Sequence, residues 1–182
     1  EVYTLNGKTG SYTSGRIATG DYEQPGGFHQ QYGKWEARIK APVGNGLVSS
    51  WWTVGDGEYW PKNGEIDLVE LQGRYLNKYF PAIHAAKTDG SHYAITKTLS
   101  TTGQALATWH TISMEWIPGR ITWFRDGGQM WTLSQQDAES IVGRVWPFDD
   151  RPHRAILCLS VGGTFGGPPD GTTVFPADLL VD

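Results

Sequence analysis

Three acidic residues in one short window have types and spacing that could support acid–base chemistry. Glu65, Asp67 and Glu70 are separated by two and then three positions in a segment that is otherwise largely apolar. In a regular strand successive side chains point to opposite faces, so Glu70 would lie opposite to Glu65 and Asp67. Each face would then bury a charge among aliphatic side chains, which is unfavourable without a partner.

A single extra residue in this strand gives a cleaner arrangement. A β-bulge at Leu68-Val69 resets the alternation of side chains. The polar side chains then share one face and the aliphatic ones the other: Glu65, Asp67, Glu70 and Gln72 against Ile66, Leu68 and Leu71. The sequence therefore predicts a bulge at this point and a sheet surface that carries all three carboxyl groups.

Carboxyl groups that crowd one surface cannot all ionise freely, so at least one pKa is expected to be raised. A neutral carboxyl beside an ionised one suits glycoside hydrolysis, in which one protonates the leaving oxygen and the other attacks the anomeric carbon or activates water. Neighbours on one bulged strand can approach to about 5–5.5 Å, the separation that favours retention through a covalent glycosyl-enzyme. A solvated acidic face and a calcium site are alternatives that these residues alone leave open.

The composition indicates one β-rich domain. The 182 residues contain 9 Trp, 8 Tyr, 6 Phe and 24 Gly, and only 19% are charged. This balance excludes a disordered chain and argues against a helical bundle. The net charge of −4 gives no basic footprint for nucleic acid, and no apolar run is long enough to predict a membrane span. The one cysteine, Cys158, has no partner for an internal disulfide.

The elements that must position the acidic strand are themselves predicted to be strands. Turn residues recur between short runs rich in Trp, Val, Ile, Thr and Tyr, a pattern typical of an all-β sandwich or barrel. Residues 34–40 alternate apolar and charged side chains, which predicts a half-buried strand. Three short strands are expected between residues 109 and 133, joined by turns at Pro118-Gly119 and Asp126-Gly127.

Two further segments complete the expected framework. The nearly continuous apolar run 154–161 predicts a strand covered on both sides. Residues 135–142 form the only segment with a helical pattern, and Ser134 is expected to be its N-cap.

The window Gly64 to Glu70, preceded by Trp60-Pro61, closely resembles the signature of glycoside hydrolase family 16, in its bulged, laminarinase-like branch. Other blocks resemble the family in the same order: Tyr12 to Ile17, Tyr32 to Lys40, Gly46 to Trp52, Ile83-His84, Trp109 to Trp116 and Val161 to Gly163. The resemblance covers nearly the whole chain. It implies one domain over residues 1–182 with an all-β jelly-roll sandwich, similar to concanavalin A and other lectins, and a substrate cleft across the concave sheet.

The resemblance also implies the roles of the acidic residues. Glu65 matches the nucleophile and Glu70 the general acid/base of the family. Asp67, between them, would hydrogen-bond to the nucleophile and tune it.

Four further residues match substrate-binding positions of the family. Trp52 and Trp60 match aromatic positions that stack on sugar rings, and the flat faces of sugars pack well on indole rings. Arg16 and His84 match polar positions that line the cleft. Three other tryptophans and one histidine are expected to have structural roles: Trp35, Trp116, Trp123 and His110.

The implied activity is that of a retaining endo-glycosidase that hydrolyses β-1,3-glucan or mixed-linkage β-glucan by double displacement. The alternatives are an agarase or other β-galactan hydrolase of the same fold and a non-catalytic glucan-binding module. Carrageenan is disfavoured because the 15 basic residues are scattered along the chain. The resemblance further implies a secreted monomer whose partner is a polysaccharide and which requires no cofactor.

The chain departs from the family pattern in three places. Phe165 stands where the family usually carries Trp, and Ala85-Ala86-Lys87 replaces a glycine-rich segment, which affects the expected substrate preference. The family domain is usually longer, so edge strands are expected to be missing at both ends. Asp182 matches an acidic position of a structural calcium site, but its partners lie outside the chain and no metal is predicted.

Overall fold

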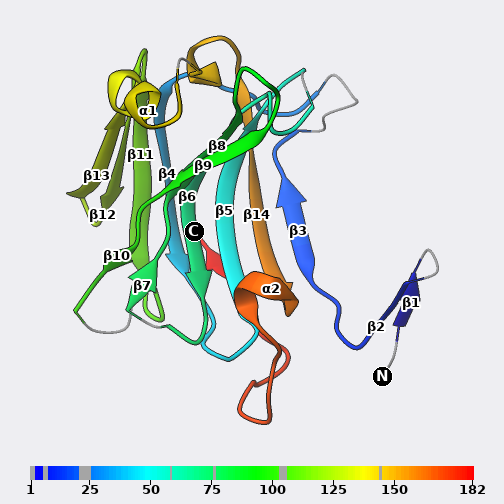
Figure 1. Ribbon diagram of the computed structural model, residues 1–182. Coiled ribbons are helices and arrows are strands. Elements are labelled where there is room, and N and C mark those ends of the chain that lie inside the picture. The colour runs from blue at the N-terminus through cyan, green and yellow to red at the C-terminus, as the bar shows by residue number, and fades with distance from the viewer. Residues whose placement is uncertain are drawn as a thin grey trace.

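Two antiparallel sheets pack face to face in the computed structural model, which describes residues 3–5, 8–20, 26–57, 59–75, 77–102, 106–143 and 145–182. Figure 1 shows these two layers, with the acidic strand β6 (Glu65–Gln72) near the middle of the molecule. The all-β sandwich predicted from the sequence is therefore confirmed.

The acidic strand lies in the interior of the larger sheet. This six-stranded sheet has the order β3-β14-β5-β6-β8-β9. Its other members are β3 (Gly15–Ala18), β14 (His153–Val161), β5 (Leu47–Gly55), β8 (Ala82–Ala86) and β9 (His92–Thr96). Because β6 has a hydrogen-bonded neighbour on each side, its backbone is held in place from both edges.

The second sheet covers one face of the first. It has five strands in the order β13-β12-β11-β4-β15. Its members are β13 (Gly128–Ser134), β12 (Arg120–Arg125), β11 (His110–Ile117), β4 (Gly33–Lys40) and β15 (Leu180–Val181). The strand expected over 34–40 and the three expected between 109 and 133 are confirmed, and the two predicted turns join β11 to β12 and β12 to β13.

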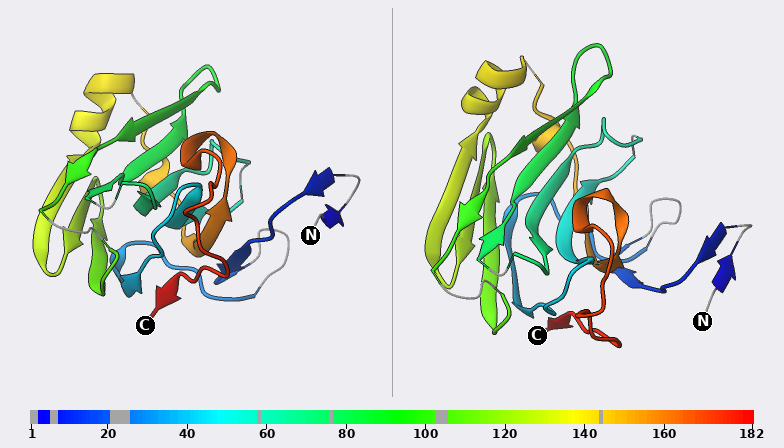
Figure 2. Two further views of the ribbon diagram at one scale, coloured as in Figure 1. Left: turned by 90° about the horizontal axis from the view of Figure 1, so that it is seen from below. Right: turned by 60° about the horizontal axis from the view of Figure 1, so that its bottom comes forward.

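Small elements complete the described structure. They are the hairpin of β1 (Tyr3–Leu5) and β2 (Lys8–Gly10), the pair β7 (Lys78–Tyr79) and β10 (Leu99–Ser100), helices α1 (Gln135–Val142) and α2 (Gly163–Gly166), and the 3-10 turn Pro147–Asp149. Both views of Figure 2 place the β1–β2 hairpin beside the sandwich rather than within it. Among the described residues, no helix has the length and apolar character needed to traverse a bilayer.

Helix α1 begins and ends as the sequence predicts. The Ser134 side chain accepts a hydrogen bond from the Asp137 backbone N–H, and the Asp137 side chain accepts one from the Ser134 N–H. This reciprocal capping satisfies two backbone donors that would otherwise lack partners at the first turn.

Tryptophans fill much of the space between the sheets. Trp35, Trp116 and Trp123 are buried, with exposed fractions of 6%, 0% and 1%, so their predicted structural placement is confirmed. Trp51 is buried in the same core, whereas Trp52, the next residue on β5, points to the opposite face. Alternation along the strand separates the two indoles.

Strand β14 differs from its prediction. Its first residues, His153 to Ile156, are buried, but Leu157 to Val161 are only partly buried. The prediction that the run is covered on both sides is therefore wrong for its second half, because the apolar run does not reveal which of its faces another element covers. The short helix α2 was also not predicted, since Gly163 to Gly166 reads as a glycine-rich loop.

Candidate active site

The predicted bulge is present in β6. On the neighbouring strand Trp51 pairs with Val69, and the next residue, Trp52, pairs with Asp67, so Leu68 is the extra residue. Leu68 is fully buried in the core between the sheets. The alternation resets at this position, as expected for a bulge.

The bulge brings the three carboxyl groups to one surface. Glu65, Asp67 and Glu70 all line the same cleft, which has a volume of about 580 Å³. The cross-strand pairs extend this surface onto β5: Val54 with Glu65, Trp52 with Asp67, and Ser50 with Glu70. Ile66, Leu68 and Leu71 pack in the core on the other face, as predicted, and Val69 joins them there.

The Glu65 and Asp67 carboxyl groups are in contact with polar neighbours. Trp60 donates a hydrogen bond of 2.6 Å from its Nε1 to Oε2 of Glu65. The Glu65 and Asp67 carboxyls also hydrogen-bond to each other. Nε2 of His84 lies 3.1 Å from Oδ2 of Asp67, whose side chain is only 3% exposed. The central carboxyl is therefore enclosed by protein groups, while its two neighbours reach the cleft.

Burial raises the pKa of all three carboxyl groups. The pKa of Glu65 is raised to about 8, first because the side chain is desolvated and then because Asp67 lies beside it. Desolvation also raises the pKa of Asp67 well above its ordinary value, with the charge of Glu70 adding to the effect. The pKa of Glu70 is raised by burial and by Glu65, against the opposing influence of His84. The cluster therefore retains a proton at neutral pH, as the sequence predicts.

The candidate sugar-binding residues have distinct positions. Arg16, Trp52 and Trp60 all line the cleft. The Arg16 guanidinium carbon lies 5.3 Å from the centre of the Trp52 ring, within range of a cation–π interaction. Trp60 is half exposed, and its bond to Glu65 ties the aromatic ring to the carboxyl cluster. His84 is not among the described residues that line the cleft and instead contacts Asp67.

One histidine of the site was missed by sequence reasoning. His92 on β9 lies 2.9 Å from His84, measured from its Nε2 to Nδ1 of His84. The two rings are parallel, with an interplanar angle of 3°, and the Trp60 ring lies 4.8 Å from that of His92. Hydrogen bonding at Nδ1 of His84 leaves Nε2 directed at Asp67. The register that pairs His92 with Ala86 gives this contact, and no local sequence signal indicates it.

Helix α2 and the residues around it form one wall of the cleft. Phe165, the departure from the family pattern, lines the cleft, and its ring packs edge-on against Phe80 with centroids 5.6 Å apart. The backbone carbonyl of Phe165 accepts a hydrogen bond of 2.6 Å from the Gln72 side chain. The last residue of β6, Gln72, thus anchors helix α2, which carries Phe165.

The only potential metal-binding group found among the described residues belongs to this cluster. Ligand atoms of Glu65, Asp67 and His84 lie within 4.8 Å of one another. The same side chains form the Glu65–Asp67 hydrogen bond and the His84–Asp67 contact. Asp182, the candidate calcium ligand, lies elsewhere and contacts Arg38 on β4, with 3.4 Å between Oδ2 and Nη1.

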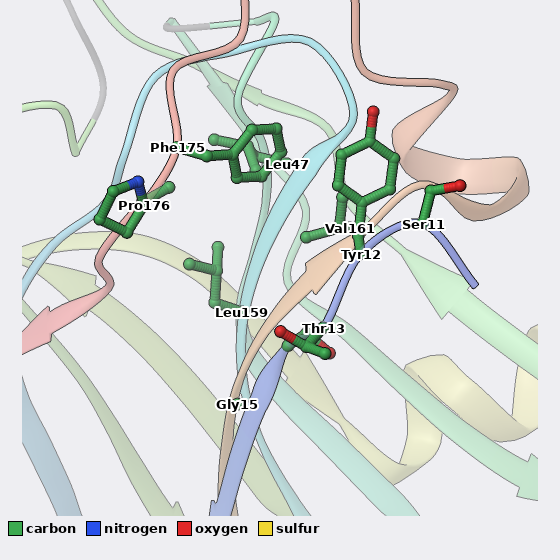
Figure 3. A pocket seen from close by; sticks show the side chains of 11 residues that line it. Ser11, Tyr12, Thr13, Gly15, Leu47, Leu159, Val161, Phe175 and Pro176 are labelled. Carbon is green, nitrogen blue, oxygen red and sulfur yellow. The ribbon is translucent and has the colours of Figure 1, made fainter. Parts of the chain in front are cut away.

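A second pocket lies on the opposite face of the same sheet. It has a volume of about 620 Å³ and is lined by Leu47, Leu159 and Val161, which alternate with cleft residues along β5 and β14. Figure 3 shows Tyr12 and Phe175 beside each other among the residues that line it; their rings stack with centroids 5.1 Å apart. No carboxyl group lines this pocket in the part of the chain described, so the chemistry belongs to the first cleft.

Comparison with known proteins agrees with this geometry. Residues 4–172 match the family model described as glycosyl hydrolases family 16. A beta-glucanase of Rhodothermus marinus is 31% identical over 94% of this chain and 60% of its own length. Glucan endo-1,3-beta-glucosidase A1 of Niallia circulans is 30% identical over 94% of this chain and 26% of its own. The chain therefore spans less than two thirds of either relative.

Solved structures share the whole of the fold. The laminarinase catalytic domain of Thermotoga maritima superposes with a TM-score of 0.84 at 32% identity, covering 100% of this chain and 71% of that one. The endo-beta-1,3-glucanase of Pyrococcus furiosus gives a TM-score of 0.85 at 32% identity, covering 100% and 69%. The sandwich is thus the jelly roll of these enzymes, and the chain belongs to glycosyl hydrolases family 16, in its laminarinase-like branch.

Proposed function

We propose that this chain hydrolyses β-glucan within the polymer, at β-1,3 linkages of laminarin-type or mixed-linkage chains, with retention of anomeric configuration. The observation that carries this proposal is the bulge, which directs Glu65, Asp67 and Glu70 from one strand into one cleft. The relatives named as a beta-glucanase and as a glucan endo-1,3-beta-glucosidase support glucan as the substrate.

In the proposed mechanism Glu70 donates a proton to the leaving glycosidic oxygen while Glu65 attacks the anomeric carbon. The bond from the anomeric carbon to the leaving oxygen breaks as the bond to the Glu65 oxygen forms. Glu70, now ionised, then takes a proton from a water molecule that attacks the glycosyl-enzyme and releases Glu65. Two carboxyl groups and water supply every group that this reaction needs, so we propose no cofactor or metal.

The attacking carboxyl must be ionised, although burial favours its neutral form. Two neighbouring groups favour the ionised form of Glu65. The Trp60 N–H donates to Glu65 and stabilises its carboxylate. The electrostatic influence of His84 also lowers the pKa of Glu65, against the effect of Asp67, which raises it. Trp60 and His84 therefore favour the ionised Glu65 that the proposed attack requires.

We further propose that sugar rings bind along the cleft against Trp52 and Trp60, with Arg16 as a hydrogen-bond donor to hydroxyl groups. All three side chains line the cleft on the carboxyl-bearing face, which supports this role. Aromatic faces pack against the C–H faces of sugars, and guanidinium groups donate in a fixed planar geometry. We propose a secreted monomer whose partner is the polysaccharide itself.

The test is substitution of each reacting carboxyl by its amide. Glu65→Gln and Glu70→Gln should each lower kcat on laminarin by about 1,000-fold or more, because each removes a group required for a chemical step. Glu115→Gln, on the exposed face of β11, is the matched control and should leave kcat unchanged. Circular dichroism of each variant checks that the fold is retained.

A substrate panel distinguishes the alternatives. Laminarin, lichenan and agarose are digested in parallel, and NMR follows the anomeric configuration of the first product. Cleavage of laminarin or lichenan with retention is expected. Cleavage of agarose alone would assign the β-galactan activity instead, glucan binding without cleavage would assign a binding module, and an inverted product would contradict the double displacement.

A further inference from the structure

A buried tryptophan of the opposite sheet is bonded to the backbone of the acidic strand. Trp123 on β12 is 1% exposed, and its Nε1 donates a hydrogen bond of 2.9 Å to the backbone carbonyl of Asp67. This bond crosses the core between the two sheets. It ends at the residue that immediately precedes the extra residue of the bulge, Leu68.

The bond gives a hydrogen-bond donor to a backbone carbonyl at the bulge. A bulge disrupts the regular ladder, and a buried carbonyl left without a donor costs about 1–3 kcal/mol. Core tryptophans of this protein do not generally form such bonds, because the indole nitrogens of Trp35 and Trp116 have no partner among the described residues. Of these three buried indoles, Trp123 is the one whose N–H is bonded, and its acceptor lies at the bulge.

The indole of Trp123 is itself held in a defined position. Its ring stacks on that of Trp131, with centroids 4.5 Å apart and an interplanar angle of 17°. The β12–β13 pairing also shifts register directly after Trp123, where Phe124 pairs with Gln129. Irregularities in both sheets thus meet at this one side chain, and its N–H links them.

We propose that Trp123 is a positioning residue for the reaction: its N–H fixes the bulge and thereby sets the placement of Glu70 relative to Glu65 and Asp67. This inference rests on the proposed function. The bulge lies between Asp67 and Glu70, so any rotation of its peptide groups changes the distance between the acid/base and the nucleophile. Displacements of about 1 Å in a catalytic group cost about 100-fold in rate.

The experiment removes the donor and keeps an aromatic ring. Trp123→Phe should lower kcat on laminarin by about 10- to 100-fold while KM changes less than about threefold, because the bond acts on the reacting groups and not on sugar contacts. Trp116→Phe is the matched control, since its indole is equally buried but its nitrogen has no partner in the described structure. It should lose stability and retain kcat.

Two further measurements separate positioning from packing. Replacing Trp123 by benzothienylalanine, in which sulfur takes the place of the indole N–H, keeps the shape of the side chain and should reduce kcat as Trp123→Phe does. Carboxyl carbon NMR of the glutamates should show that the apparent pKa values of the cluster move in Trp123→Phe and stay unchanged in Trp116→Phe. This readout needs no substrate.

The outcomes are distinct. If the wild type cleaves glucan and the benzothienylalanine variant keeps both its kcat and its carboxyl titration, the positioning role of Trp123 is overturned. If the wild type cleaves no glucan, the proposed function fails, and the carboxyl titration still decides whether Trp123 positions the cluster.

Discussion

Two opposing influences act on the pKa of the Glu65 carboxyl group. Its pKa of about 8 reflects burial beside Asp67, whereas its bond from Trp60 favours the ionised form. Ionisation of Glu65 in this buried position destabilises the folded state. The carboxyl group should therefore affect the free energy of unfolding as well as the reaction.

The free energy of unfolding should therefore fall as the pH rises from about 4.5 to about 8. Unfolded Glu65 ionises near its ordinary pKa of 4.5, whereas in the folded protein its pKa is about 8. The folded state binds more protons between these values, so the contribution of this group is complete below pH 4.5 and is lost as the pH rises through 8. Glu65→Gln should be more stable than the wild type above pH 8 by a few kcal/mol, at about 1.4 kcal/mol for each unit by which the pKa is displaced.

Urea unfolding at several pH values measures this effect. Glu115→Gln, whose side chain is exposed on β11, should follow the wild-type curve. Parallel curves for Glu65→Gln and the wild type from pH 5 to pH 9 would show that Glu65 carries no such cost.

At the residue scale the sequence predicts what is local and misses what depends on register. The faces of Glu65, Asp67 and Glu70 follow from alternation and one bulge within a single strand, so they could be predicted. His92 contacts His84 through the pairing of β8 with β9, and Trp123 reaches Asp67 across the core. Both contacts depend on how separate strands are placed, which no spacing along the chain encodes.

Removing the extra residue of strand β6 tests whether the bulge is required for folding and for the reaction. Deleting Leu68 would let every residue keep its present partner on β5, because Val69 already pairs with Trp51 and Asp67 with Trp52. The three carboxyl groups would still share one face. The deletion variant should therefore fold, at a cost of roughly 2–5 kcal/mol for the lost buried leucine, and its kcat should fall no further than that of Trp123→Phe.

Leu68→Ala is the matched control for this deletion, because it removes most of the side chain and keeps the bulge. Thermal unfolding and laminarin hydrolysis are measured for both variants. A deletion variant that fails to fold while Leu68→Ala folds would mean that the bulge itself, and not only the side chain, is required for the sheet.

The sequence predicts a strand or helix correctly where the periodicity of its own side chains shows which face is buried. Strand β4 and helix α1 carry clear periodicity and were predicted within a residue of their observed bounds. The prediction for strand β14 is wrong in its second half because an apolar run does not reveal that only the first half is covered. Helix α2 is built largely from glycine, whose sequence signal is that of a turn.

The larger sheet has different roles on its two faces. The carboxyl groups face one cleft, and the apolar pocket beside Tyr12 and Phe175 opens on the other. Contacts of the second pocket join residues near the start of the chain to residues near its end. They should therefore affect the stability of the whole sandwich without affecting the reaction.

Phe175→Ala tests this separation. Loss of the stacked pair with Tyr12 should lower stability by about 1 kcal/mol, or roughly 2–4 °C in Tm for a domain of this size. The value of kcat on laminarin should stay within about twofold of the wild type. Val174→Ala, at a neighbouring exposed position, is the control and should leave Tm unchanged. A fall in kcat of tenfold or more in Phe175→Ala would show that the two faces are coupled.

The attachment of all three carboxyl groups to one strand also has a mechanical consequence. The groups proposed to hold sugar belong to other segments, since Arg16 lies on β3 and Trp52 on β5. Warming loosens strands against one another far more than it stretches a single covalent chain. As long as the hydrogen bond from Trp123 to Asp67 is kept, warming should lower the affinity for the glucan chain before it changes the distances between the three carboxyl groups.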